Sequence, residues 1–128
     1  MEQAFRAILH AATAVTNLAP TSRINFGERP QGKPLPAIAM TVTNNNRGHT
    51  LKGADGLFVG RVQVDCYGDT YADAKNLSLA ALAALDSYRG GNFSSITDDG
   101  SQDLREGGGN EADRPYRVKI DFITNWRP

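Results

Sequence analysis

The stretch that most restricts the fold is the C-terminal run Tyr116–Trp126, because its residues alternate with a period of two. One set of alternate positions is apolar or aromatic apart from one threonine, and consists of Tyr116, Val118, Ile120, Phe122, Thr124 and Trp126. The other set contains the polar residues Arg117, Lys119, Asp121 and Asn125. Successive side chains of a strand point to opposite faces, so this run predicts a half-buried strand of an antiparallel sheet.

A second long strand is predicted at Leu57–Tyr67. At the usual rise each long strand extends about 36 Å, which is as wide as a compact domain of this size. We therefore expect strand ends or open sheet edges to project from the body of the protein. Shorter strands are predicted at Arg23–Phe26 and Ala37–Thr43, and "NFSSIT" and "QDLRE" are further strand candidates around a predicted turn at "DDGSQD".

Two helices are predicted. The first covers Glu2–Leu18, where apolar residues recur at helical spacing, and Pro20 ends it. The second opens at Asp69 or Thr70, where Thr70 and Asp73 have capping-box spacing, and closes at Gly90-Gly91. Its apolar residues also continue around the back of the helix, at Leu79 and Ala83 among others. A second apolar surface of this kind predicts a contact between subunits.

The chain of 128 residues has the length of one ordinary domain, so residues 1–128 are expected to form a single unit. The order helix, three strands, helix and further strands predicts an α+β fold. In that fold both helices cover one side of a mainly antiparallel or mixed sheet. The polar stretch 44–56 and the glycine-rich stretch 107–114 are expected to be flexible loops.

Charge and cysteine content exclude several classes of partner. Fourteen basic residues balance fourteen acidic ones, and the basic residues are scattered, so we expect neither sequence-specific nucleic-acid binding nor a membrane partner. One cysteine cannot form an internal disulfide, and Glu2, Arg6 and His10 interrupt the apolar stretch that a secretory signal needs. The expected compartment is a reducing one.

The segment "VQVDCYGDTYADA" (Val62–Ala74) combines the only cysteine with three aspartates and could be read as an active site. Strand alternation places Cys66 with the valines of the core and Asp65 on the opposite face, so the two cannot act together. A cysteine among valines behaves as a small apolar residue, and only His10 or His49 could serve as its base. Cys66 is therefore expected to be structural.

We also expect no metal site built from Asp65, Asp69 and Asp73, because the three lie in a strand, a turn and a first helical turn. Carboxylates at a helix start complement the helix dipole, which accounts for Asp69 and Asp73. We expect no catalytic residue, no metal and no cofactor. A small cytoplasmic enzyme or ligand-binding protein that uses Cys66 or Asp65 in a pocket remains an alternative from another class.

Candidate assembly residues fall into three groups. The first is the polar stretch with Arg47, His49 and Lys52, and the second is the back of the second helix at Leu79 and Ala83. The third is the polar strand face of Arg61, Gln63 and Asp65, which is expected to form cross-strand charge pairs with Arg117, Lys119 and Asp121.

Several segments together resemble a known family. An N-terminal helix is followed by "PQGKPLPAI" (Pro30–Ile38), "RVQVDCYGDTYADAKNLS" (Arg61–Ser78) and "YRVKIDFITNW" (Tyr116–Trp126). In order and length this series resembles the small tail-completion proteins of long-tailed phages, which are also described as tail terminator or head-to-tail joining proteins. The resemblance covers nearly the whole chain, and its motifs are structural rather than chemical.

The resemblance implies an α+β subunit that forms a ring, a hexamer, at the head-proximal end of the tail tube. There the ring would stop tube polymerisation and offer a docking surface to the head-tail connector or stopper protein. The implied partners are further copies of the chain, the tube protein and the connector or stopper, with DNA passing through the ring. The implied location is the neck of the virion after assembly in the host cytoplasm, and gene transfer agents use similar parts. Another neck, connector or tube-associated structural protein is the alternative within this class.

Overall fold

The computed structural model of the chain describes residues 1–27, 35–50, 53–105 and 116–127, with side chains described outside 45–50, 53–57 and 104–105. Three helical segments precede the strands of a sheet, and a third α-helix interrupts the strands. The elements in chain order are α1 (Glu2–Ala11), α2 (Thr13–Thr16), the 3₁₀ turn η1 (Thr21–Arg23), β1 (Ile24–Phe26), β2 (Ala37–Thr50), β3 (Gly53–Gly68), α3 (Tyr71–Leu85), β4 (Tyr88–Gly90), β5 (Phe93–Arg105) and β6 (Tyr116–Trp126).

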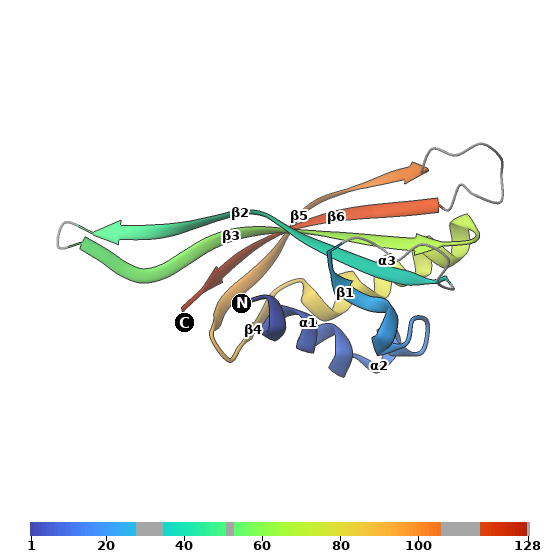
Figure 1. The fold of residues 1–128 in the computed structure, drawn as a ribbon, viewed down its shortest axis with the longest axis horizontal. Helices are drawn as coiled ribbons and strands as arrows, with labels where there is room; N and C mark the ends of the chain where they lie inside the picture. The colour runs from blue at the N-terminus through green and yellow to red at the C-terminus, as the bar shows by residue number, and fades with distance from the viewer. Residues whose placement is uncertain (28–34, 51–52, 106–115, 128) are drawn as a thin grey trace.

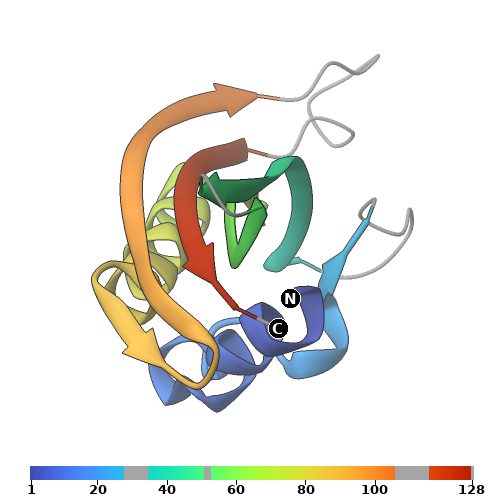
Figure 2. The ribbon, with the colours of Figure 1, turned by 90° about the vertical axis from the view of Figure 1, so that its left-hand side faces the viewer.

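The strands form one mixed sheet in the order β1-β2-β3-β6-β5-β4. Only β1 and β2 are parallel, and the other neighbours are antiparallel. The helices lie along one face of the sheet (Figure 1), and the view along the strands shows how strongly the sheet curls (Figure 2). The predicted α+β fold is confirmed as a single domain.

The core lies between the helices and the inner face of the sheet. In β6 the buried positions are Val118, Ile120, Phe122 and Thr124, as the alternation predicts. At the centre, Phe5 from α1 is fully buried, and its ring meets the edges or faces of three other phenylalanines. The ring centroids lie 6.1 Å from Phe26, 6.3 Å from Phe93 and 6.3 Å from Phe122. One aromatic side chain thus connects the first helix to three strands.

The predicted helix over Glu2–Leu18 is wrong in one respect, since it breaks at Ala12. Ala12 has extended backbone angles (φ −83°, ψ 106°), and α2 follows as a single turn. The β-branched residues Thr13, Val15 and Thr16 follow the break, and such residues have lower helix propensity. The change of direction brings Val15 and Ala19 into the core, where both are fully buried.

The start of α3 agrees with the capping prediction, whereas its end does not. The backbone N–H of Asp73 donates to the Thr70 hydroxyl at 3.1 Å, which is an N-cap. The helix ends at Leu85 rather than at Gly90-Gly91, and residues Tyr88–Gly90 form β4. Contacts with β5 cause this early end, because the Asp86 carboxylate accepts from Asp98 N at 3.1 Å and Ser87 N donates to Ile96 O at 2.8 Å.

The connection expected over residues 44–56 is mostly strand. β2 continues to Thr50, and β3 begins at Gly53 and pairs with it, with register shifts between Val42 and Asn44 and between Arg47 and His49. Backbone hydrogen bonds do not require apolar side chains, so two polar segments form strands wherever their backbones can pair. The paired ends of β2 and β3 project well beyond the helical layer (Figure 1), as the length of the strands predicted. The loop expected over 107–114 lies outside the described residues.

The two short strand candidates after Gly91 are one strand. β5 runs from Phe93 to Arg105, and the predicted turn is a bulge with a register shift between Asp98 and Ser101. Gly100 takes a left-handed backbone (φ 117°), and its N–H donates to Asp98 Oδ1 at 2.9 Å. The turn-forming residues therefore bend the strand without ending it.

Candidate assembly surface

Cys66 is a core residue. Its side chain is 0% exposed, and it pairs in the sheet with Ile38 on one side and Val118 on the other. Burial, with a smaller contribution from the Asp65 charge, raises the pKa of the Cys66 thiol far above its ordinary value. A thiol that stays protonated is neither a nucleophile nor a metal ligand. The structural interpretation of Cys66 agrees with this geometry.

We predict that the Cys66 thiol reacts with Ellman's reagent only when the protein unfolds. Native protein should react at least about a hundredfold more slowly than protein in concentrated urea, because labelling needs opening of the core. Substituting Cys66→Ala should cost about 1–2 kcal/mol of unfolding free energy and leave assembly intact. Rapid labelling of native protein would contradict the burial of this thiol.

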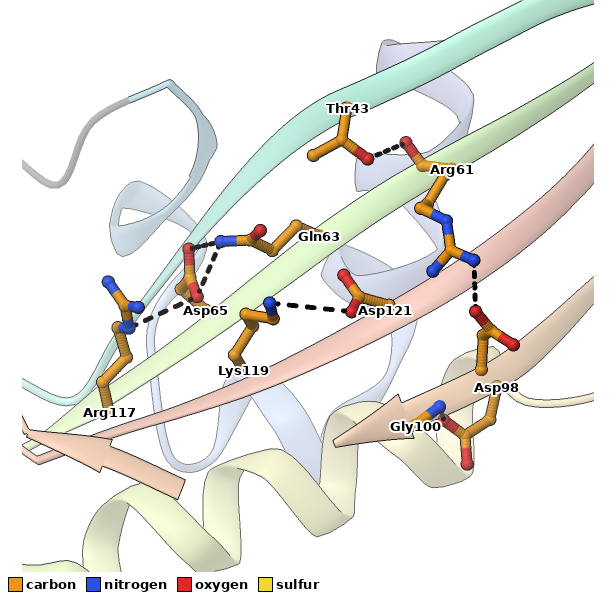
Figure 3. A network of polar contacts seen from close by, with 10 residues as sticks. Thr43, Arg61, Gln63, Asp65, Asp98, Gly100, Arg117, Lys119 and Asp121 are labelled. Atoms are coloured by element: carbon orange, nitrogen blue, oxygen red, sulfur yellow. Dashed lines mark hydrogen bonds and ion pairs between the residues drawn. The ribbon is translucent and has the colours of Figure 1, made fainter. Parts of the chain in front are cut away.

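Asp65 lies on the other face of β3, in a polar cluster shown in Figure 3. Gln63 Nε2 donates to both of its carboxylate oxygens, at 3.2 and 3.0 Å, and Arg117 Nε lies 3.6 Å from Oδ1. The curled sheet leaves Asp65 only 6% exposed. Burial raises the pKa of the Asp65 carboxyl above its usual value, and it outweighs the opposing effects of Gln63, Arg117 and Lys119.

Asp65 should make stability fall as the pH rises. Its pKa is higher in the folded protein than the ordinary value of 3.8, so the unfolded chain ionises first, and the free energy of unfolding falls as the pH passes from 3.8 through the raised pKa. Asn cannot ionise, so the stability of the wild type relative to Asp65→Asn should decrease over that window. Urea titrations of both proteins at several pH values measure the difference.

Asp103→Asn is the matched control for this titration. Hydrogen bonds from the Tyr71 hydroxyl and from Lys75 lower the pKa of Asp103, so its contribution to stability is present above pH 3.8 and is lost as the pH falls. The stability of the wild type relative to Asp103→Asn should therefore increase with pH. Equal slopes for the two variants would contradict the assigned environments.

The predicted charge pairs across the polar face are confirmed in part. Asp65 pairs with Arg117 across β3 and β6, and Lys119 Nζ lies 3.8 Å from Asp121 Oδ2 within β6. Arg61 instead reaches past β6 to Asp99 of β5. Its direct neighbour in β6 is Ile123, which offers no charge. The face therefore ties three strands together, although each exposed pair contributes under about 1 kcal/mol.

The outer side of α3 is exposed, as predicted for Leu79 and Ala83. Leu79 is 54% exposed, and Ala83 is also exposed. Among the three groups of candidate residues, the one with Arg47, His49 and Lys52 is the least described. Arg47 and His49 belong to the projecting part of β2, but their side chains, like the whole of Lys52, lie outside the described residues.

One cluster of polar residues was not predicted. The Tyr71 hydroxyl donates to Asp103 Oδ2 at 2.9 Å, and Lys75 Nζ donates to Asp103 Oδ1 at 3.2 Å. These contacts fasten the start of α3 to β5. The two segments are distant in the sequence and their residue types are ordinary surface ones, so no sequence signal could have paired them.

Two shallow surface grooves are apolar and lie away from Cys66 and Asp65. One, of about 330 Å³, is lined by Glu2, Phe26, Gly27, Met40, Thr41 and Val42. The other, of about 450 Å³, is lined by Ala4, Ala7, Ile8, Ala11, Ala12, Ala84 and Tyr88. The residues that the structure describes contain no group of three His, Cys, Asp or Glu side chains able to hold a metal ion. Within the same residues, no helix combines the length and apolar character needed to span a bilayer.

Cys66 is fully buried, and the Asp65 carboxylate is 6% exposed and bonded within the sheet. The family model of Tail completion protein gp17 matches residues 3–125, and the chain belongs to this family. It is therefore a tail completion protein of phage-like particles, a structural component of the virion and not an enzyme. The alternative of a small enzyme using Cys66 or Asp65 is wrong.

A solved structure agrees on the fold. A chain of the "Virion of native gene transfer agent (GTA) particle" is 16% identical, with a TM-score of 0.67. The match covers 100% of this chain and 95% of that chain. No curated protein matches the sequence. At this identity the likeness shows the shared α+β architecture over the whole chain.

Proposed function

We propose that six copies of the chain close into a ring at the head-proximal end of a tail tube. The ring stops polymerisation of the tube protein and docks onto a head-tail connector or stopper protein, and DNA passes through it. The observation that carries this proposal is membership of the tail completion family over residues 3–125. The similar chain in the gene transfer agent virion supports a place in such a particle.

The shape of the subunit supports closure into a ring. The long strands β2 and β5 flank the sheet, while the strands beyond them, β1 and β4, have three residues each. Long exposed edges invite uncontrolled addition of strands, and a closed ring is one way to cover them all. Closure also fixes the number of copies, which suits a component that must end a polymer.

Within this proposal the three groups of candidate residues become contacts. The apolar outer side of α3, with Leu79 and Ala83, packs against a neighbouring subunit. The polar face with Arg61, Gln63 and Asp65 contacts neighbours, the tube or the connector. The polar stretch with Arg47, His49 and Lys52 does the same. The chain has equal numbers of acidic and basic residues, and its basic residues are scattered, so it lacks a concentrated positive surface that would hold DNA. This suits a ring through which DNA passes.

Leu79→Asp is expected to weaken the ring at least tenfold in subunit affinity, because it places a charge in an apolar contact. The free energy of unfolding of the monomer should change by less than about 0.5 kcal/mol, since Leu79 is mostly exposed. Asn76→Ser, on the same exposed side of α3 but without a new charge, is the control and should weaken assembly much less. Sedimentation velocity measures the assembly of both variants. Full assembly of Leu79→Asp would show that α3 does not contribute to the subunit interface.

The proposal as a whole is tested by deleting the gene in a particle-producing strain and by locating the protein in intact particles. We expect tails of uncontrolled length that fail to join heads. Tails of normal length that join heads without the protein would overturn it. A position at the connector or along the tube would instead support the alternative of another neck or tube-associated component.

A further inference from the structure

Two strand edges of the subunit have no strand partner among the described residues. β1 pairs with β2 only at Ile38–Met40, so β2 from Thr41 to Thr50 is open on that side. β4 pairs with β5 only as far as Ile96, so Ser101–Arg105 is open on the outer side of β5. The two open edges lie on opposite sides of the sheet and toward opposite ends of the strands (Figure 1).

The hydrogen-bond pattern shows which groups these edges present. Gly27 N donates to Met40 O at 2.9 Å, so the backbone groups of Met40 point toward the β1 side. In an antiparallel ladder alternate residues point to alternate neighbours, so Val42 points the same way, into the open edge. The same alternation carries across the next two strands. The backbone groups of Val64, which is opposite Met40, point to β6, and those of Lys119, next to the residue opposite Val64, point to β5. Lys119 is opposite Gln102, so the N–H and C=O groups of the next residue, Asp103, point outward from β5.

Strand direction makes the two edges compatible. The four long strands β2, β3, β6 and β5 alternate in direction, each antiparallel to the next. A second copy placed with its β2 beside β5 is again antiparallel, so the alternation continues without interruption. Pairing of like edges, β2 with β2 or β5 with β5, relates two subunits by a twofold axis. Such pairs cannot repeat head to tail around a ring.

The surroundings of the β2 edge suit an incoming strand. The 330 Å³ groove lies where β1 stops, and its apolar lining includes Phe26, Met40 and Val42. Side chains of an added strand that point toward the helices would enter this groove. The sequence of β2 from Thr41 to Thr50 has basic residues and no carboxylate, whereas the open segment Ser101–Arg105 of β5 has one aspartate and one arginine. The β5 edge therefore carries no net positive charge that would repel β2.

We propose that β5 of one subunit pairs antiparallel with the open edge of β2 in the next subunit, which makes one sheet continuous around the ring. This inference rests on the ring of the proposed function and names its contact. Because the open segments lie toward opposite strand ends, neighbours are staggered along the strands. A stagger repeated around a closed sheet requires strands that tilt against the ring axis.

Ser101→Pro tests the β5 edge. The outward N–H of Ser101 makes no ladder bond to β6 in this pattern, and proline is tolerated at edge positions of that kind. The variant should remain folded and should assemble about tenfold more weakly or worse, because each contact loses a donor and meets the proline ring. Ser101→Ala keeps the N–H and should assemble as the wild type does. Normal assembly of Ser101→Pro would overturn the pairing.

Cross-linking provides a second test that does not depend on the proline variant folding. Two single-cysteine chains in a Cys66→Ala background are mixed, one with Thr41→Cys or Thr43→Cys and the other with Gln102→Cys. Thr41 and Gln102 pair with Gln63 and Lys119, so both lie on the sheet face opposite the helices. A short bismaleimide should link unlike chains, and links between like chains should be absent.

The outcomes separate this inference from the proposed function. Links between like chains, links from Gln102→Cys to a tube or connector protein, or a ring without links all overturn β2–β5 pairing and leave the ring in place. A wild-type protein that forms no ring, alone or in particles, overturns the proposed function and this contact with it.

Discussion

Replacing Phe5 with alanine is expected to lower the free energy of unfolding by about 3–5 kcal/mol. The side chain is fully buried, and its ring packs against Phe26, Phe93 and Phe122. Truncation removes apolar area and leaves a cavity between α1 and the sheet, which a curled sheet cannot close by a small movement. Because α1 meets the sheet through this residue, we also expect loss of helical circular dichroism before the main transition. Urea unfolding, followed by helical circular dichroism and by a second signal that reports the main transition, measures the two effects.

Phe26→Ala is the control for Phe5→Ala. Phe26 packs against the same ring but is only partly buried at the edge of the sheet, so its truncation should cost roughly half as much. Equal costs for the two substitutions would show that the phenylalanine cluster is not centred on Phe5.

Gly68→Ala is expected to destabilise the protein by about 3 kcal/mol or more. Gly68 ends β3 just before α3, and a Cβ there would lie 2.5 Å from Ala74 N and 2.9 Å from Asp73 Cβ. Both obstacles belong to the first turn of α3, and the first is backbone, so the helix start or the strand end has to move. Movement would also strain the Thr70 cap, whose bond to Asp73 N is 3.1 Å long. Chemical denaturation, with a crystal structure of the variant, measures the cost and the shift.

Gly90→Ala separates this steric effect from the general effect of glycine replacement. A Cβ at Gly90 would meet the Tyr88 hydroxyl at 3.0 Å, and that group is the far end of a side chain that can rotate. We expect a change of less than about 1 kcal/mol. A small effect of Gly68→Ala, similar to that of Gly90→Ala, would contradict the close approach of β3 and α3.

Local patterns predicted those elements whose signals lie within one segment. The alternation of Tyr116–Trp126 identified β6 and its buried face, and the spacing of Thr70 and Asp73 identified the α3 cap. The same alternation separated Cys66 from Asp65, which excluded their joint action. In each case the physical cause is short-range: side-chain direction in a strand, or a hydroxyl within reach of a free N–H.

Features that depend on pairing between distant segments were not predictable. The polar ends of β2 and β3 read as a loop, because backbone hydrogen bonds between them leave no mark on side-chain pattern. The bulge in β5 and the early end of α3 depend on each other through Asp86 and Asp98. The ion pair of Arg61 with Asp99 needs the register of β3, β6 and β5 together. All three features depend on which residues are neighbours across the sheet, and the sequence alone does not supply that information.

Cryo-electron microscopy of intact particles, with the protein located by an added tag, tests the central claim most directly. The account predicts a closed sixfold ring of this protein between the last ring of the tail tube and the head connector. Monomeric copies at that position, or copies only elsewhere in the particle, would contradict it.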